Sequence, residues 1–324
     1  MHRRIKVNLI FIVFVLALIF LIENWCTNNP KFLNENYKTI NNSPKTEEEE
    51  IIVLRPIPTN TNGSPKIESI LKKTSSRIKF DLRNYSFTNS GVRKLEDLLI
   101  KFGGKPVRSV VISAWRSGST FLGELLNAMP SNFYHYEPLL KYQIKQIRGP
   151  PHADQATSFL KSMLRCNYSG MEDYFIYGKT HLNYLNQFKH NTRLWDYCKY
   201  EIELCLDANF TASYCSLFPF QSMKLVRYRL HLVDDILQDM ELNVKVVLLV
   251  RDPRGVMQSR RYRHYCQPAP DCSKPELVCA DMASDYVAAR SLMQKYPNRI
   301  ISQITRLSDQ IIKSHLKVLP PSKT

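Results

Sequence analysis

The feature that most constrains this chain is an apolar run that leads directly into a glycine turn and then into a helical pattern. The run PVRSVVIS at 106–113 has the length and apolar content of a buried strand. The helical pattern at 120–127 places Phe121, Leu125 and Leu126 on one side, and AWRSGS lies between the two segments. A strand, a tight turn and a helix in this order are typical of α/β proteins whose turn binds a phosphate.

The same arrangement recurs further along the chain. The run KVVLLV at 245–250 is too short for a typical helix, and RDPRGVMQSR follows it with Pro253 near a helix start. The run FQSMKLV at 220–226 is typical of another strand, and RLHLVDDILQDM at 229–240 of another helix. This alternation predicts an α/β fold, namely a P-loop-like three-layer domain with a central parallel sheet.

The first turn departs from the P-loop of kinases and ATPases. Aligned on Gly118, Ser113 replaces the first glycine and Ser119 replaces the lysine that reaches the phosphates, which disfavours a kinase or an ATPase. The backbone N–H groups of the remaining turn, at a helix N-terminus, can still bind an anion. The turn consists of Arg116, Ser117, Gly118, Ser119 and Thr120. The alternative is a glycine turn with a Ser/Thr helix cap.

Arg251 and Ser259 form a second candidate anion site. Arg251 ends a predicted strand and Ser259 lies in the following helix, so both reach one phosphate if the intervening turn folds back. Asp252 and Pro253 suit the cap and first turn of that helix, and we expect Arg254 to face solvent or an ion pair. Two anion sites, each at the carboxyl end of a strand, suit a nucleotide with phosphates at both ends.

The motifs WRSGSTFLGELLN, FYHYEPL and LVRDPRGVMQSR closely resemble the 5′-phosphosulfate and 3′-phosphate binding motifs of Golgi carbohydrate sulfotransferases. The similarity is to the galactose, N-acetylglucosamine and N-acetylgalactosamine 6-O group, and it covers about 105–299. It implies transfer of a sulfuryl group from 3′-phosphoadenosine 5′-phosphosulfate, PAPS, to a glycan hydroxyl, with no metal. It also implies that residues 116–120 bind the 5′ side of PAPS, and that Arg251 and Ser259 bind the 3′-phosphate.

Sulfuryl transfer requires one group that stabilises the leaving phosphate and another that accepts the proton of the attacking hydroxyl. Arg116 is the candidate for the first role. Glu137 is the candidate base, because related sulfotransferases commonly place a glutamate or histidine in this region; an ordinary ion pair is its structural alternative. His135 is the alternative base. Three basic residues either line the acceptor cleft or form a solvated basic edge: Lys224, Arg227 and Arg229.

The N-terminus predicts a membrane anchor. We interpret the basic segment 1–6 as a cytoplasmic tail and the uncharged apolar segment 7–22 as a transmembrane signal anchor. A helix from Ile5 to Ile22 would span about 27 Å, which suits thin early secretory membranes. A cleaved signal peptide is the alternative, but ENWCTNN lacks a small-x-small cleavage pattern. We therefore expect a single-pass type II protein of the Golgi membrane with its catalytic domain in the lumen.

Sequons and cysteines agree with a lumenal body. Five N-x-S/T sequons begin at Asn41, Asn62, Asn84, Asn167 and Asn209. Seven of the eight cysteines lie beyond Cys26, and an oxidising lumen would pair most of them, leaving one partner missing or one thiol free. A zinc site is the alternative, but the chain contains no tight CxxC pair.

The positive net charge of the chain favours anionic classes of partner. Its formal net charge is +16, which favours an anionic nucleotide, acidic glycan, nucleic acid or membrane surface. The resemblance favours a glycan acceptor on a glycoprotein or proteoglycan, together with the membrane of the anchor, and not nucleic acid. A homodimer is possible. The other class of function is a noncatalytic lumenal protein that has kept the fold and binds a glycan or a nucleotide.

The remaining boundaries follow from composition. Residues 23–104 are rich in Asn, Lys, Thr, Ser and Pro, so we expect a lumenal stem that ends in a short helix at about 92–102. Residues 105–299 are predicted to form the PAPS-dependent sulfotransferase domain. Residues 300–324 are interpreted as a divergent, apparently truncated C-terminus, because the RYEDL-like segment of the resembling family is not recognisable there.

Overall fold

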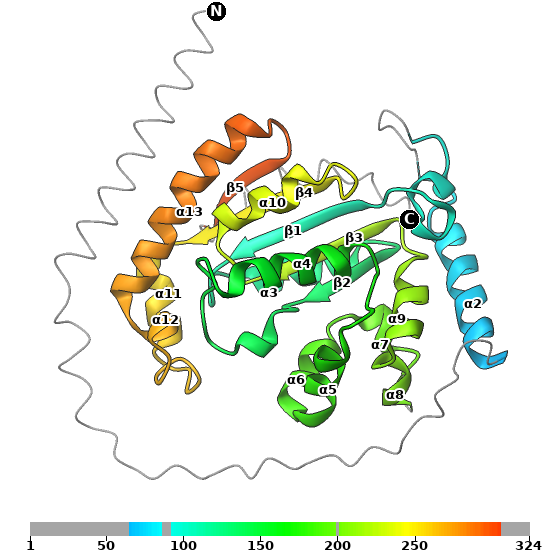
Figure 1. The fold of residues 1–324 in the computed structure, drawn as a ribbon, viewed down its shortest axis with the longest axis horizontal. Helices are drawn as coiled ribbons and strands as arrows, with labels where there is room; N and C mark the ends of the chain where they lie inside the picture. Colours follow the sequence, from blue (N-terminus) through cyan, green and yellow to red (C-terminus); the bar gives the residue numbers. More distant parts are fainter. Residues whose placement is uncertain (1–64, 86–91, 199–200, 306–324) are drawn as a thin grey trace, which may run out of the picture.

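A five-stranded sheet forms the centre of the protein (Figure 1). The computed structural model describes residues 65–85, 92–198 and 201–305. The strand order is β2-β3-β1-β4-β5, and every neighbouring pair is parallel. The strands are β1 (Val107–Ser113), β2 (Asn132–Tyr136), β3 (Phe220–Leu225), β4 (Val244–Arg251) and β5 (Ile300–Thr305). The prediction of an α/β fold with a central parallel sheet is confirmed.

Helices surround this sheet and cover both of its faces. All six residues of β3 are buried, and consecutive strand residues point to opposite faces, so neither face of this strand meets solvent. The α-helices are α2 (Pro65–Asp81), α3 (Ser119–Ala128), α4 (His152–Leu164), α5 (Glu172–Thr180), α6 (Leu182–Phe188), α7 (Thr192–Trp195), α8 (Ile202–Cys205), α9 (Ala208–Cys215), α10 (Val233–Gln238), α11 (Pro253–Arg260), α12 (Pro270–Ser273) and α13 (Pro275–Lys295). The short 3-10 helices are η1 (Leu95–Leu98), η2 (Ile100–Phe102), η3 (Leu140–Tyr142) and η4 (Leu230–Leu232).

The predicted strand–helix units are present. The strands predicted at 106–113, 220–226 and 245–250 are β1, β3 and β4, and the helix predicted at 120–127 is α3. The segment predicted as a helix at 229–240 forms η4 followed by α10. Strand β2 was not predicted, because its five residues NFYHY mix polar and aromatic side chains without a clear period of two.

The apolar side predicted for α3 is not the buried side of this helix. Phe121 and Leu125 are exposed, whereas Ser119, Gly123 and Asn127 are buried. A Cβ on Gly123 would lie 1.9 Å from the Tyr134 hydroxyl oxygen, so α3 approaches β2 more closely than a larger side chain would permit. Small and polar residues therefore form the buried face of this helix, and Phe121 and Leu125 face outward.

The expected stem contains regular structure that the sequence pattern did not predict. Helix α2 packs on the core through the buried residues Ile70 and Ile78, so the expectation of little periodic structure is wrong for this part of residues 23–104. The short helix expected at 92–102 is two 3-10 turns rather than one α-helix. Strand β5 extends the sheet beyond the predicted domain end at residue 299. The boundaries of the stem and the domain otherwise stay predictions.

Disulfides join cysteines of the described residues in three pairs: Cys166–Cys215, Cys198–Cys205 and Cys266–Cys272. Cys279 is disulfide-bonded as well, so the alternative that one of the described thiols is free is wrong.

The predicted anchor at 7–22 lies outside the described residues. Within 65–85, 92–198 and 201–305, no helix has the length and apolar content that a membrane crossing requires.

Candidate anion site and active site

The turn that follows β1 has the geometry of an anion-binding turn. Gly118 precedes α3 with a φ of 92°, a left-handed conformation that glycine adopts without steric cost. Arg116 also has a positive φ, of 69°, which is unfavourable for a residue with a Cβ and therefore must be held by its surroundings. The Ser117 hydroxyl donates to the Ala114 carbonyl oxygen at 2.8 Å and so closes the turn from inside.

The two predicted anion sites meet in the structure. Strands β1 and β4 are neighbours in the sheet, so the turns that follow them lie at the same edge. The Arg116 Nε donates to the Ser259 Oγ at 2.9 Å, and the Arg251 Nη1 donates to the Arg116 carbonyl oxygen at 3.0 Å. Neither Arg116 nor Arg251 has a carboxylate within 4 Å among the described residues. Two arginines without acidic partners therefore lie beside one helix N-terminus, which favours an anion there.

Local sequence sets the start of α11 as predicted. The Asp252 carboxylate caps the helix by accepting from the Arg254 backbone N–H at 2.9 Å, and Pro253 occupies the first turn. The Arg254 side chain is exposed and pairs with Asp252. This cap fixes where α11 begins. Ser259 lies in the last helical turn of α11 and faces Arg116.

Glu137 follows β2 and lies in a mostly buried ion pair. Its two carboxylate oxygens lie 2.5 Å from the Lys224 Nζ and 2.5 Å from the Arg227 Nη1. Burial alone would raise the pKa of the Glu137 carboxyl, but the two cations outweigh it and lower the pKa below its usual value. The Lys224 Nζ also donates to the Thr120 Oγ1 at 3.4 Å, so this ion pair is connected to the turn that begins α3.

His135 lies away from these contacts. Its ring packs edge-on against Phe133 at 5.0 Å between centroids, and both side chains are buried. Burial, and secondarily the charge of Arg108, lowers the pKa of His135 to about 3. The imidazole is therefore neutral at physiological pH and a weak proton acceptor, which disfavours it as the base.

Several site residues could not be assigned from the sequence. The alternative that Lys224, Arg227 and Arg229 form a solvated edge is wrong, because all three are buried. Lys224 lies in β3, an interior strand of the sheet, and Arg227 and Arg229 follow it. Burial of an apolar interior strand was the signal that the sequence offered. The contacts of Arg260 with the turn after β1 were not predicted either, because SRRYR looks like an ordinary basic surface segment.

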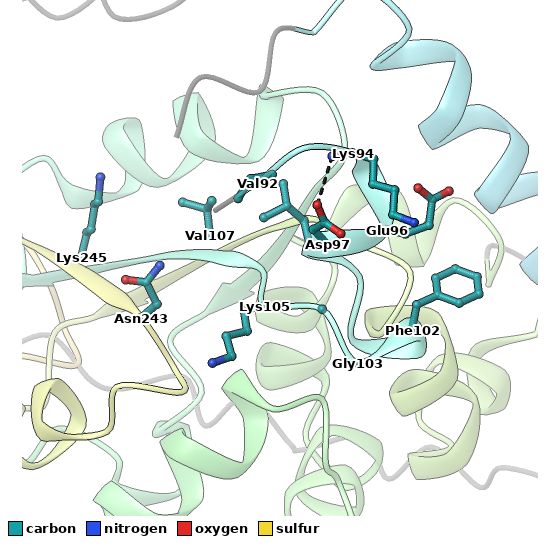
Figure 2. Close-up of a pocket in the computed structure, with 12 residues that line it drawn as sticks. Val92, Lys94, Glu96, Asp97, Phe102, Gly103, Lys105, Val107, Asn243 and Lys245 are labelled. Carbon is teal, nitrogen blue, oxygen red and sulfur yellow. Dashed lines mark hydrogen bonds between the residues drawn. The ribbon is translucent and has the colours of Figure 1, made fainter. Parts of the chain in front are cut away.

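A large cavity of about 850 Å³ lies elsewhere (Figure 2). Val107, Asn243 and Lys245 line it, so it adjoins the amino ends of β1 and β4, opposite the edge that carries the anion turn. Its lining combines exposed lysines and acidic residues with apolar residues and glycines, and it contains none of the predicted site residues. Within the described ranges, no cluster of three His, Cys, Asp or Glu residues could hold a metal ion.

Comparisons with known proteins show the family that the domain resembles. The family model described as "Sulfotransferase domain" matches residues 106–299. Carbohydrate sulfotransferase 5 of Mus musculus is 25% identical over 239 residues, which cover 67% of this chain and 57% of that protein. Carbohydrate sulfotransferase 4 of Mus musculus is 30% identical over 176 residues, covering 49% and 45% respectively. Carbohydrate sulfotransferase 6 of Homo sapiens is 28% identical over 179 residues, covering 49% and 44%.

The chain thus spans about half the length of the curated relatives it matches. No solved structure matches it.

Proposed function

The chain belongs to the sulfotransferase family, and from that membership we propose that it is an enzyme that transfers a sulfuryl group from PAPS to a glycan hydroxyl. The observation that carries this proposal is the hydrogen bond of 2.9 Å between the Arg116 Nε and the Ser259 Oγ. It joins two motifs that are 143 residues apart and brings both predicted anion sites to one edge of the sheet. A nucleotide with phosphates at both ends requires this proximity.

The residues present fit the two ends of PAPS. We assign the 5′ side to the turn, because its left-handed glycine and helix N-terminus direct backbone N–H groups at an anion. The members of this turn are Arg116, Ser117, Gly118, Ser119 and Thr120. We assign the 3′-phosphate to Arg251 and Ser259, which end β4 and lie in α11.

The chemistry needs charge stabilisation and a proton acceptor. When bound, PAPS supplies the sulfuryl group and a phosphate leaving group. Arg116 would stabilise the negative charge that develops on this phosphate, because a guanidinium is a fixed and forked donor. Glu137 would accept the proton of the acceptor hydroxyl, with its connection to the turn made through Lys224 and Thr120.

One observation favours a second candidate function. The pKa of the Glu137 carboxyl lies below its usual value because Lys224 and Arg227 pair with it, so this carboxylate is a weak base unless an ion pair opens. A protein that binds the nucleotide or a glycan without transfer would keep the same arrangement. The two functions differ in turnover, because only the enzyme transfers the sulfuryl group.

We propose a glycan with galactose, N-acetylglucosamine or N-acetylgalactosamine as the acceptor, sulfated at the 6-hydroxyl, by resemblance to the carbohydrate sulfotransferases. The decisive experiment incubates the full chain with radiolabelled PAPS and a panel of these glycans, each paired with its 6-deoxy analogue. Label should pass to the glycan and not to the analogue. Binding of adenosine 3′,5′-bisphosphate without transfer would support the noncatalytic candidate. Absence of transfer, of nucleotide binding and of glycan binding would contradict both functions.

We also propose that residues 7–22 anchor the chain in the Golgi membrane with its folded body in the lumen. Three disulfides and exposed asparagines in the sequons at Asn84, Asn167 and Asn209 support this location. In microsomes, the body should resist added protease and lose mass on glycosidase treatment. A protease-sensitive body without glycans would reverse the orientation.

A further inference from the structure

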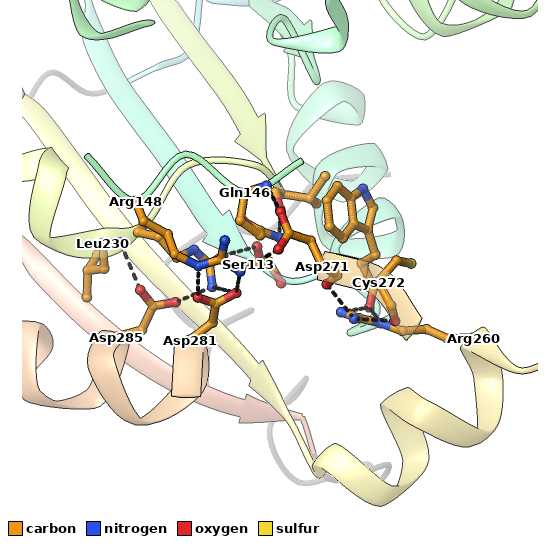
Figure 3. Close-up of polar contacts among 12 residues, drawn as sticks. Ser113, Gln146, Arg148, Leu230, Arg260, Asp271, Cys272, Asp281 and Asp285 are labelled. Carbon is orange, nitrogen blue, oxygen red and sulfur yellow. Dashed lines mark hydrogen bonds and ion pairs between the residues drawn. The ribbon is translucent and has the colours of Figure 1, made fainter. Parts of the chain in front are cut away.

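Arg260, the last residue of α11, connects the backbone before the anion turn with the backbone of α12 (Figure 3). Its Nε and Nη2 donate to the Trp115 carbonyl oxygen at 3.1 and 3.0 Å. Its Nη1 donates to the Cys272 carbonyl oxygen at 3.0 Å and to that of Asp271 at 3.5 Å. One buried guanidinium therefore connects the turn after β1 with helix α12.

Arg260 forms no direct ion pair with a carboxylate of the described residues. Among the described residues, no Asp or Glu oxygen lies within 4 Å of its guanidinium nitrogens. Burial lowers its pKa to about 10, so the side chain is still cationic at neutral pH. An unpaired buried cation is costly to the free protein, and an anion bound in the adjacent turn would reduce this cost.

The bond to Trp115 determines the orientation of one peptide plane in the turn. The Trp115 carbonyl and the Arg116 N–H belong to the same peptide group, which is trans. Since the two groups of a trans peptide point in opposite directions, fixing the carbonyl toward Arg260 directs the Arg116 N–H away from it. The left-handed φ of Arg116 requires such support, because the conformation is unfavourable without it.

A second path of contacts returns from α12 to the same turn (Figure 3). The Arg148 Nη2 donates to the Asp271 Oδ1 at 2.8 Å, and its Nε donates to the Asp281 Oδ1 at 2.7 Å. The Arg229 Nη1 lies 3.8 Å from the Asp281 Oδ2, and its Nη2 donates to the Ser113 carbonyl oxygen at 3.3 Å. The segment that leads from β1 into the turn is thus held at Ser113 and at Trp115 by connected polar contacts.

We propose that Arg260 is a positioning residue for the nucleotide's 5′-phosphate group, acting through the Trp115–Arg116 peptide without touching the nucleotide. The inference rests on the proposed function, because it assumes that the turn binds the 5′ side. It predicts a selective defect: ligands with a 5′-phosphate lose affinity when Arg260 is replaced, and ligands with only a 3′-phosphate do not.

The test compares two ligands on the full chain by isothermal titration calorimetry. The ligands are adenosine 3′,5′-bisphosphate and adenosine 3′-monophosphate, and the variants are Arg260→Gln and Arg260→Lys. Arg260→Gln should weaken binding of the bisphosphate about ten- to a hundredfold, as expected for a misplaced binding group, and leave the monophosphate unchanged. Arg260→Lys should not restore binding, since an ammonium cannot make the forked contact. Arg254→Ala, an exposed arginine on the same helix, is the control and should bind both ligands normally.

Two outcomes would overturn the inference while the proposed function stands. One is bisphosphate affinity equal to that of the wild-type chain in a folded Arg260 variant. The other is an equal loss for both ligands, which would mean a general structural role. If Arg260→Gln does not fold, Arg260→Lys decides by the same comparison. A wild-type chain that binds neither nucleotide would instead refute the proposed function, and the inference with it.

Discussion

Replacing Glu137 with Gln tests the centre of the proposed active site. The substitution keeps the shape of the side chain and removes its charge and its basicity. In the wild-type chain the carboxylate lies 2.5 Å from both the Lys224 Nζ and the Arg227 Nη1, and the three side chains are only 12%, 2% and 5% exposed. The variant therefore leaves two buried cations without their acidic partner.

Glu137→Gln should change both the free energy of unfolding and the transfer rate. Breaking a buried ion pair by removing one partner costs about 3–5 kcal/mol in the free energy of unfolding. If Glu137 also accepts the proton of the acceptor, the transfer rate of folded molecules should fall by about 10² to 10⁴, which corresponds to about 2.7–5.4 kcal/mol in the barrier. Nucleotide affinity should not fall, because the substitution removes a negative charge from the neighbourhood of an anion.

The assay pairs three measurements on one preparation: denaturant unfolding, single-turnover transfer, and equilibrium binding of adenosine 3′,5′-bisphosphate. Glu241→Gln is the matched control, because Glu241 pairs with Lys105 at 2.9 Å with both side chains well exposed, so its loss should cost less than about 1 kcal/mol. Normal transfer per folded molecule in Glu137→Gln would refute the base assignment and leave a structural ion pair. Normal stability would refute the reasoning about the buried charges.

Three further outcomes are expected. Arg251→Ala should weaken binding of adenosine 3′,5′-bisphosphate by about 2 to 4 kcal/mol in calorimetric titration, because a charged donor in a sheltered site is lost. The stability that Glu137 contributes should be complete above its usual pKa of 4.5 and be lost as the pH falls through its lower folded pKa, measured as a shrinking difference in unfolding free energy between the wild-type chain and Glu137→Gln. Replacing Cys166 and Cys215 with serine should cost about 4 kcal/mol in denaturant unfolding, since this disulfide closes a loop of 49 residues.

For each of these three predictions, one result would contradict it. An unchanged dissociation constant in folded Arg251→Ala would remove this residue from the 3′-phosphate site. A stability difference for Glu137→Gln that persists in acid would mean that its carboxylate is not the titrating group. Unchanged stability in the double serine variant would mean that the reduced chain is already restrained in its unfolded state.

The parts of the fold that were predictable are those where local pattern and tertiary burial agree. Strands β1, β3 and β4 are apolar runs bounded by turn residues, and Pro253 marks the start of α11. Helix α3 shows the opposite case, because the close approach of Gly123 to Tyr134 decides which face is buried, and no property of a single helix reports that approach. Helix α2 was missed because its sequence PKIESILKKTSSRIKFD is mostly polar, and only packing on the core stabilises it.

The candidate site also combines features that the sequence predicts with features that only the fold determines. The proximity of Arg116 and Arg251 could be predicted because both lie at carboxyl ends of apolar strands, and Ser259 lies in the helix that Pro253 begins. Their roles in binding stay predictions. The pairing of Glu137 with Lys224 could not, because it depends on β2 and β3 being neighbours in the sheet. Arg260 is likewise indistinguishable in sequence from the exposed arginine that follows it, and only the fold buries it.

The connection from Arg260 to Trp115 spans 145 residues, and this separation has a consequence for how the protein is made. A nascent chain that has emerged only as far as β3 already contains the complete turn motif, yet Arg251 of β4 and Arg260 of α11, which bind backbone carbonyl groups there, have not emerged. Because domains acquire long-range contacts only after both partners are available, the turn reaches its final shape late in synthesis. If the chain binds PAPS as proposed, a fragment that ends before α11 lacks these supports of the turn and should bind the nucleotide more weakly.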